Sequence, residues 1–286
     1  YDVVGVTMKL FCYGEEVPDR PCCSLDSIDD ARRVCQQLGV PHYVVNLEDR
    51  FGADVVDDFV QEYARGRTPI PCVRCNTFTK FRDLLRTARA IDADWIATGH
   101  YARAEDGRLL RGADASKDQT YFLWGIDRAV LARMLLPVGA RTKAETRAVA
   151  RSLGLDVVAD KVESQDICFV PDGDHTTIIR QRLGADAPSL QRGPFVHVDG
   201  RVLGEHEGDA RYTIGLVDAP ARGARGQVQV RHRARAVDAT LLRADGDEIE
   251  LALEEPVAAI TPGQSLVLYD GDVVLGGAFI EAAVGQ

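Results

Sequence analysis

The stretch Val3-Val4-Gly5-Val6-Thr7-Met8-Lys9-Leu10 places a run of strand-forming residues near the start of the chain. Its length and β-branched content are typical of a buried strand. Further short apolar runs at 43–47 and 95–98 are separated by stretches of helical periodicity at 25–38, 55–65 and 78–91. Strands that alternate with helices predict an α/β fold, in which a parallel sheet is covered by helices on both faces.

Three candidate site residues lie at the carboxyl ends of these predicted strands: Met8, Gly99 and His100. Ligands of parallel α/β sheets bind beyond the carboxyl ends of the strands. Glycine at such an end lets a ligand approach the backbone closely, and a histidine there can contact a phosphate or a base. The alternative is a capped strand end whose histidine is satisfied by a backbone carbonyl.

The pattern changes after a helix predicted at 143–153. Residues 160–220 are mixed, with one short helix at 176–183, and from 227 onward short apolar runs alternate with turn signals such as Asp270-Gly271-Asp272. We therefore predict three domains: an α/β catalytic domain at 1–160, a small central domain at 161–222 and a C-terminal β-barrel at 223–286.

Composition limits the classes of function. The 286 residues carry a net charge of −10 and seven cysteines, an odd number at irregular spacing. No apolar run approaches the roughly 20 residues that span a bilayer, and the cysteine usage favours a reducing compartment, so we expect a cytoplasmic protein with no membrane partner. The acidic excess argues against a DNA-coating protein, but the basic stretch 222–235 leaves an RNA partner open.

Three cysteines are the candidates for chemistry. Cys72 and Cys75 form a Cys-x-x-Cys pair, and Cys168 lies far along the chain. Such a pair is found in redox dithiols, in zinc sites and among the ligands of iron–sulfur clusters. Pro69 and Pro71 favour a loop that leads into the helix predicted from 78. Ordinary semi-buried thiols remain an alternative, and Cys168 alone is typical of a small core residue.

Polar residues suggest where an anion could bind. A helix beginning at Ser116 would direct Lys117 and unpaired backbone N–H groups at an anion; the alternative is a solvated, capped first turn. Arg231, His232 and Gln264 could contact nucleic acid, although a solvated strand face is the simpler interpretation.

Six segments, in this order, resemble the bacterial tRNA-specific 2-thiouridylases, which exchange oxygen for sulfur at the wobble uridine. The matching segments are 5–10, 68–76, 97–102, 116–123, 164–169 and 261–264. The resemblance implies an ATP-pyrophosphatase-type α/β domain, a small central domain and a C-terminal β-barrel. It also implies a tRNA-uridine sulfurtransferase.

The same resemblance implies roles for particular residues. ATP, with Mg²⁺, adenylates the uridine oxygen; Cys168 carries the incoming sulfur as a persulfide; and Cys75 is the nucleophile that works with it and can close a disulfide with it. Met8 and Gly99 resemble ATP contacts. The residues next to the target base are Ile70, Pro71 and Cys72, and the further tRNA contacts are His100, Lys117, Asp118, Gln119, Arg231, His232 and Gln264. The expected sulfur donor is a cysteine desulfurase or a sulfur-relay protein.

The chain departs from the family pattern at three places. The glycine-rich loop Ser-Gly-Gly-x-Asp-Ser is absent and is expected upstream of Tyr1. A basic Gln-Arg-Lys-Gly segment is missing after Tyr212-Thr213-Ile214-Gly215, where we also expect residues to be lacking. Cys72 stands where some relatives carry an aspartate, so Cys72, Cys75 and Cys168 could instead hold a [4Fe–4S] cluster with one open iron.

Alternatives to this function come from other classes. The persulfide scheme is slightly favoured over the cluster because Cys168 is so distant from the pair in sequence. A non-catalytic tRNA- or nucleotide-binding module is a second possibility. Another ATP-pyrophosphatase relative, such as an amidotransferase or ligase, is disfavoured because those enzymes lack the paired Cys75 and Cys168.

Overall fold

The computed structural model describes residues 1–11, 25–161, 167–170, 173–196, 201–206, 225–245, 248–258 and 260–283. Strand β1 (Gly5–Lys9) pairs in parallel with β2 (His42–Asn46), and helix α1 (Leu25–Gln37) connects them. Strands β3 (Ile96–Ala97) and β6 (Met134–Leu135) form a second parallel pair. The predicted α/β character with parallel strands is confirmed, although within the described ranges the four strands lie in two separate pairs.

Two long helical runs begin earlier than their periodicity predicted. The first comprises α2 (Glu48–Phe51), a π-helical turn (Gly52–Val56) and α3 (Asp57–Ala64). The second comprises α4 (Pro71–Arg74), a π-helical turn (Cys75–Lys80) and α5 (Phe81–Ala90). The prediction of a loop around Cys72 and Cys75 was wrong. Pro71 occupies the first helical position, where its missing N–H costs nothing and its fixed φ favours the helix.

The C-terminal strands form an antiparallel sheet with an unexpected extension. Its members are β9 (Arg225–Gln229), β10 (Val237–Asp245), β11 (Glu248–Leu253), β12 (Ser265–Asp270) and β13 (Val273–Phe279). The hairpin predicted at 270–272 is confirmed, because Asp270 pairs with Val273 across it. Strand β13 also pairs with β5 (Arg108–Arg111), which pairs with β4 (Ala102–Glu105), so a hairpin of the α/β part continues the sheet of the barrel.

The other α-helices and strands follow, apart from the 3₁₀ helices Thr120–Phe122 and Pro188–Leu190. They are α6 (Arg128–Leu131), α7 (Lys143–Ser152), α8 (Asp156–Ala159), α9 (Thr176–Leu183), β7 (Gly193–Val196) and β8 (Val202–His206). The helices predicted at 143–153 and 176–183 are thus confirmed. Within the described ranges, none of the helices has both the length and the apolar composition needed to cross a membrane.

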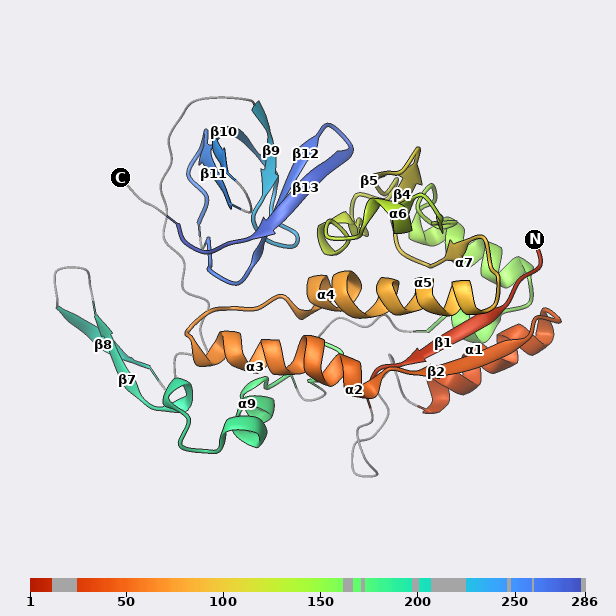
Figure 1. Ribbon diagram of the computed structural model, residues 1–286, viewed down its shortest axis with the longest axis horizontal. Coiled ribbons are helices and arrows are strands. Elements are labelled where there is room, and N and C mark those ends of the chain that lie inside the picture. The colour runs from red at the N-terminus through yellow and green to blue at the C-terminus, as the bar shows by residue number, and fades with distance from the viewer. Residues whose placement is uncertain are drawn as a thin grey trace.

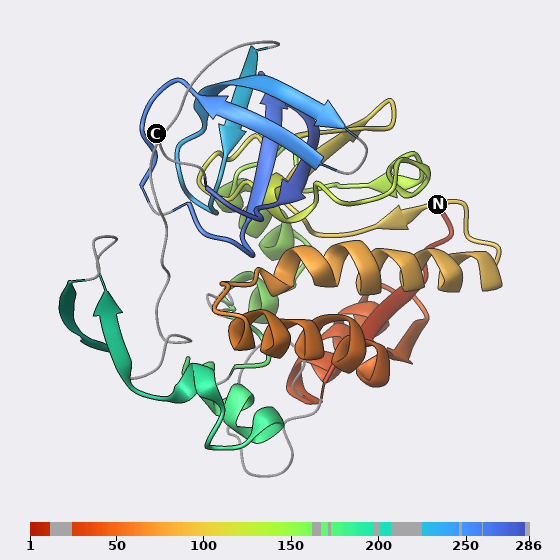
Figure 2. The ribbon, with the colours of Figure 1, turned by 60° about the vertical axis from the view of Figure 1, so that its left-hand side comes forward.

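The arrangement in space places the second helical run at the centre. The barrel and the β1–β2 pair lie on opposite sides of the α4–α5 run in both views, and the β7–β8 hairpin stands apart from both (Figure 1, Figure 2). Helix α4, which carries the cysteine pair, is the end of this run nearer the barrel (Figure 1).

Candidate functional site

One apolar cluster brings together three candidate site residues that the sequence analysis identified separately. Cys75, only 5% exposed, belongs to the buried cluster that includes Phe51 and Phe59, and the partly buried Met8 and Cys168 pack against it. The predicted nucleophile, the predicted persulfide carrier and one predicted ATP contact therefore share one environment.

An aromatic contact positions the segment that carries Cys168. The Phe169 ring meets Phe51 at a centroid distance of 5.6 Å and Phe59 at 5.1 Å, both edge to face. Such pairs contribute beyond the area that they bury. Phe169 therefore anchors residues 167–170 against α2, which ends at Phe51, and α3, which carries Phe59. Residues 162–166, which precede Cys168, lie outside the described residues.

Cys72 lies apart from this apolar environment because its side chain is exposed. The neighbouring Arg74 is held by helix α3, where its Nε lies 2.9 Å from an Asp58 carboxylate oxygen. Burial raises the pKa of Asp58 even though Arg74 opposes this. Within the described ranges, no group of three or more His, Cys, Asp or Glu side chains is placed to hold a metal ion. The three thiols as arranged do not fit a [4Fe–4S] cluster.

The end of β3 carries two further candidates, Gly99 and His100. Gly99 is exposed, and a Cβ added there would meet no atom of the described residues within 4 Å, so the space beside this position is open. The His100 ring lies 5.6 Å from Phe81, and its Nδ1 is 2.9 Å from the Thr98 hydroxyl. Burial, together with the charge of Lys80, lowers the pKa of His100 to about 4. His100 is therefore a neutral hydrogen-bonding group near pH 7.

This pKa predicts how stability depends on pH. An unfolded histidine, with a pKa of 6.5, binds a proton as the pH falls, whereas folded His100 does not until about pH 4. The free energy of unfolding should therefore fall between pH 7 and pH 5, by about 2 kcal/mol from this residue. Urea unfolding of wild type and His100→Asn at both pH values measures it: the variant should lose about 2 kcal/mol less than wild type on acidification. Equal losses would contradict a depressed pKa.

The polar run after Ser116 does not form a regular α-helix. A turn is followed by a 3₁₀ helix at Thr120–Phe122. Asp118 explains this, because one carboxylate oxygen accepts from the Gly112 N–H at 2.9 Å and the other from the Thr120 hydroxyl at 2.7 Å. Such local side-chain bonds compete with helix formation.

Gln119 fixes the backbone just after His100. Its side-chain oxygen accepts from the Tyr101 N–H at 2.8 Å, while its own N–H donates to the Tyr101 carbonyl at 2.9 Å. Asp118 and Gln119, both expected to contact tRNA, therefore also hold the backbone of their own chain.

A polar cleft separates this run from the barrel. Its volume is about 590 Å³, and Arg111, Asp118, His232, Arg233 and Arg235 are among the residues that line it. Arg231 adjoins it in sequence, and Lys117 adjoins Asp118.

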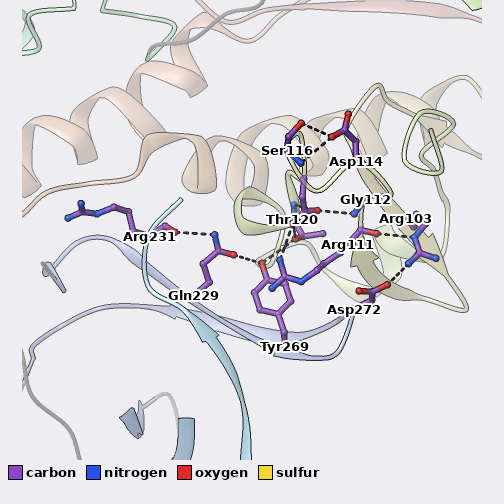
Figure 3. Close-up of polar contacts among 11 residues, drawn as sticks. Arg103, Arg111, Gly112, Asp114, Ser116, Thr120, Gln229, Arg231, Tyr269 and Asp272 are labelled. Atoms are coloured by element: carbon purple, nitrogen blue, oxygen red, sulfur yellow. Dashed lines mark hydrogen bonds and ion pairs between the residues drawn. The ribbon is translucent and has the colours of Figure 1, made fainter. Parts of the chain in front are cut away.

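Buried hydrogen bonds beside the cleft join the run after Ser116 to the barrel (Figure 3). The Thr120 hydroxyl lies 3.2 Å from the Tyr269 hydroxyl, which donates to Gln229 at 3.3 Å. The Arg111 guanidinium stacks on the Tyr269 ring, 3.6 Å from its centroid. Tyr269 and Arg111 were not identified from the sequence, since their strands, β12 and β5, become neighbours only because β13 pairs with both.

His232 faces aromatic rings at this cleft. Its ring lies 4.3 Å from Phe122, and burial together with Arg233 lowers its pKa. The Nδ1 of His232 is buried and has no hydrogen-bond partner among the described residues. Arg233 is exposed and has a backbone φ of 64°, a conformation that costs a non-glycine residue about 1 kcal/mol.

Gln264, also expected to contact tRNA, does not line the cleft. Its side-chain nitrogen donates to the Thr68 carbonyl at 2.9 Å and lies 3.4 Å from the Pro69 carbonyl. These carbonyls directly precede the buried Ile70 and Pro71, which were assigned to the target base. Residues 212–215, where a basic segment was expected to follow, lie outside the described residues.

Comparisons with known proteins agree with this architecture. Residues 1–172 match a family model described as a tRNA methyl transferase HUP domain, and residues 216–280 match one described as an aminomethyltransferase β-barrel domain. The HUP model corresponds to the nucleotide α-hydrolase-like α/β fold expected from the sequence.

Full-length relatives extend the match to the whole chain. A tRNA-specific 2-thiouridylase of Geobacter metallireducens is 42% identical, over 100% of this chain and 92% of its own length. Proteins with the same name from Geotalea uraniireducens and Rhodospirillum centenum are 40% and 41% identical, each over 99% of this chain and over 89% and 86% of their own lengths. On the strength of these matches and of the α/β and barrel architecture, this chain belongs to the tRNA-specific 2-thiouridylase family.

Proposed function

We propose that this protein is an ATP-dependent tRNA sulfurtransferase that converts the wobble uridine to 2-thiouridine. The observation that carries the proposal is the shared apolar cluster of Cys75 and Cys168 in a chain of this family. The two thiols are 93 residues apart in sequence (168 − 75), and the fold brings both to this cluster, as thiol exchange between them requires.

Cys168 and Cys75 each take part in a defined step of the proposed reaction. The carbonyl carbon of uracil is a poor electrophile, and adenylation of its oxygen creates a leaving group. The terminal sulfur of a Cys168 persulfide attacks carbon 2, and AMP departs with the original oxygen. The Cys75 thiolate then attacks the Cys168 sulfur, which leaves the transferred sulfur on the base and forms a Cys75–Cys168 disulfide. An external thiol must reduce this disulfide before the next cycle.

Recognition would use two regions. ATP would lie against Met8 and the open space at Gly99. The tRNA backbone would follow the polar cleft with its arginines, and the target base would leave its stack at a cost of a few kcal/mol. The sulfur donor, which we propose is a cysteine desulfurase or a relay protein, must deliver a sulfane sulfur to Cys168. A cytoplasmic location remains a prediction.

The test supplies the complete gene product with ATP, a persulfide donor and unmodified tRNA. Nuclease digestion followed by mass spectrometry measures 2-thiouridine. Its formation only with ATP and donor together supports the proposal. A protein that binds tRNA but forms none would instead be a binding module.

A substitution of Arg233 tests whether the tRNA backbone follows the polar cleft. We expect Arg233→Ala to weaken tRNA binding several-fold and to reduce the slope of log affinity against log salt by about 1, because one phosphate contact is lost. Filter binding across a salt series measures both quantities. Arg89→Ala, an exposed site on α5 outside the lining of the cleft, is the matched control and should change neither. An unchanged slope for Arg233→Ala would place the tRNA elsewhere.

A further inference from the structure

The barrel turn 261–265 is hydrogen-bonded to Thr68 and Pro69, which lie just before helix α4 and the cysteine pair. The side-chain amide nitrogen of Gln264 donates hydrogen bonds to the carbonyls of Thr68 and Pro69, at 2.9 and 3.4 Å. In return the Thr68 N–H donates to the Pro262 carbonyl at 2.9 Å. Arg67 adds an ion pair to Glu281 at 2.6 Å. Three residues beyond Thr68, Pro71 begins the helix that carries Cys72 and Cys75.

Gly263 allows this close approach. A Cβ there would lie 2.9 Å from the Thr68 carbonyl oxygen and 3.0 Å from its carbon. Its φ of +91° also belongs to the region that favours glycine. The turn and the 68–69 backbone are therefore in direct contact, with no room for a side chain between them.

A second set of hydrogen bonds connects the same turn with Asn76, the residue that follows the cysteine pair. Ser265 accepts a hydrogen bond from the Tyr121 hydroxyl at its carbonyl, at 2.8 Å, and one from the Trp124 indole at its hydroxyl, at 3.1 Å. Between these two residues, the Phe122 carbonyl accepts from the Asn76 side chain at 3.0 Å. Asn76 directly follows Cys75 and is 4% exposed.

We propose that Gln264 is a positioning residue: by holding the carbonyls of Thr68 and Pro69, it fixes the start of helix α4 and thereby keeps Cys75 in register with Cys168. The expected effect on catalysis rests on the proposed sulfur transfer. The positioning of helix α4 by Gln264 rests only on the contacts described above. It differs from the expectation that Gln264 contacts tRNA, because its amide nitrogen is already engaged within the chain.

The residue type suits this role. An amide nitrogen carries two N–H donors and no charge, so one side chain can serve two carbonyls. Gln264→Met keeps the length and removes the donors. Gln37→Met is a matched control, since the Gln37 amide also donates to two backbone carbonyls, those of Leu153 and Gly154, each at 3.2 Å, and it lies on α1, outside the cluster of Cys75 and Cys168.

The experiment measures alkylation of the native protein by iodoacetamide. Trypsin cleaves after Arg67, Arg74 and Lys80, so Cys72 and Cys75 appear on separate peptides. Exposed Cys72 is then an internal reference for buried Cys75. We expect Gln264→Met to raise the Cys75 rate about ten-fold relative to Cys72, equivalent to about 1.4 kcal/mol. We also expect it to lower kcat about ten-fold with an unchanged KM for tRNA. Gln37→Met should alter neither.

The outcomes separate this inference from the proposed function. An unchanged Cys75 rate overturns the positioning role, and an accompanying rise in KM would make Gln264 a tRNA contact. If wild type forms no 2-thiouridine, the proposed function fails while the alkylation result still decides the positioning role. Should Gln264→Met not fold, Gln264→Asn, whose amide is one methylene shorter, should show smaller changes in the same direction; no change in that variant overturns the inference.

Discussion

Cys75→Ser should abolish 2-thiouridine formation, lowering the rate by at least about a thousand-fold. Serine is nearly isosteric, so the apolar cluster around position 75 should persist, but an alcohol oxygen cannot complete the thiol–disulfide exchange that releases the sulfur. Cys168→Ser should be equally inactive, because no persulfide can form there. Mass spectrometry of digested tRNA under single-turnover conditions measures all variants.

The double variant sharpens this prediction. Two thiols that act in one sequence of steps should show no additivity, so Cys75→Ser with Cys168→Ser should be no worse than either alone. Cys35→Ser, a half-buried thiol on α1, is the control and should retain wild-type activity. Activity in Cys168→Ser would mean that sulfur reaches the base without a persulfide at this position.

Cys72→Ser distinguishes the two sulfur schemes. Cys72 is exposed, whereas the other two thiols lie in the apolar cluster, so transfer that uses only two thiols should tolerate this change. A loss as large as that of Cys75→Ser would show that all three thiols are required, as a cluster would demand.

Local patterns predicted elements well where the periodicity was strong. The alternation around Val3–Leu10 and 43–47 indicated the parallel pair β1–β2, and the turn at 270–272 indicated the β12–β13 hairpin. The start of α4 was missed because two prolines suggested a loop, although proline at the first helical position is favourable.

Long-range contacts were not accessible from local pattern. No periodicity links Cys168 with Cys75, and their shared cluster depends on Phe169 docking against Phe51 and Phe59. The role of Gln264 likewise depends on how the barrel meets residues 68–69. The family resemblance named these residues, but only their contacts distinguish a side chain that holds the chain from one available to a ligand.

Gly139→Ala should strongly destabilise the fold, although it adds only one methyl group. A Cβ at this position would lie 1.7 Å from the Ala102 carbonyl oxygen and 2.5 Å from its carbon. Ala102 is fully buried at the start of β4, so the obstacle is backbone and cannot rotate away. Overpacking that forces the backbone to move costs about 3 kcal/mol or more. Urea unfolding should show a lower midpoint with an unchanged m value.

Gly52→Ala is the matched control for this change. Gly52 has helical dihedrals and open space around its Cβ position, so alanine there should be neutral or stabilise the protein by up to about 1 kcal/mol. Equal midpoints for the two variants would contradict the clash.

We also expect Gly139→Ala to affect activity, because Ala102 directly follows Tyr101, whose N–H and carbonyl are hydrogen-bonded to Gln119. Displacement of Ala102 would move His100 at the end of β3, so the variant should lose tRNA thiolation at temperatures where it is still folded.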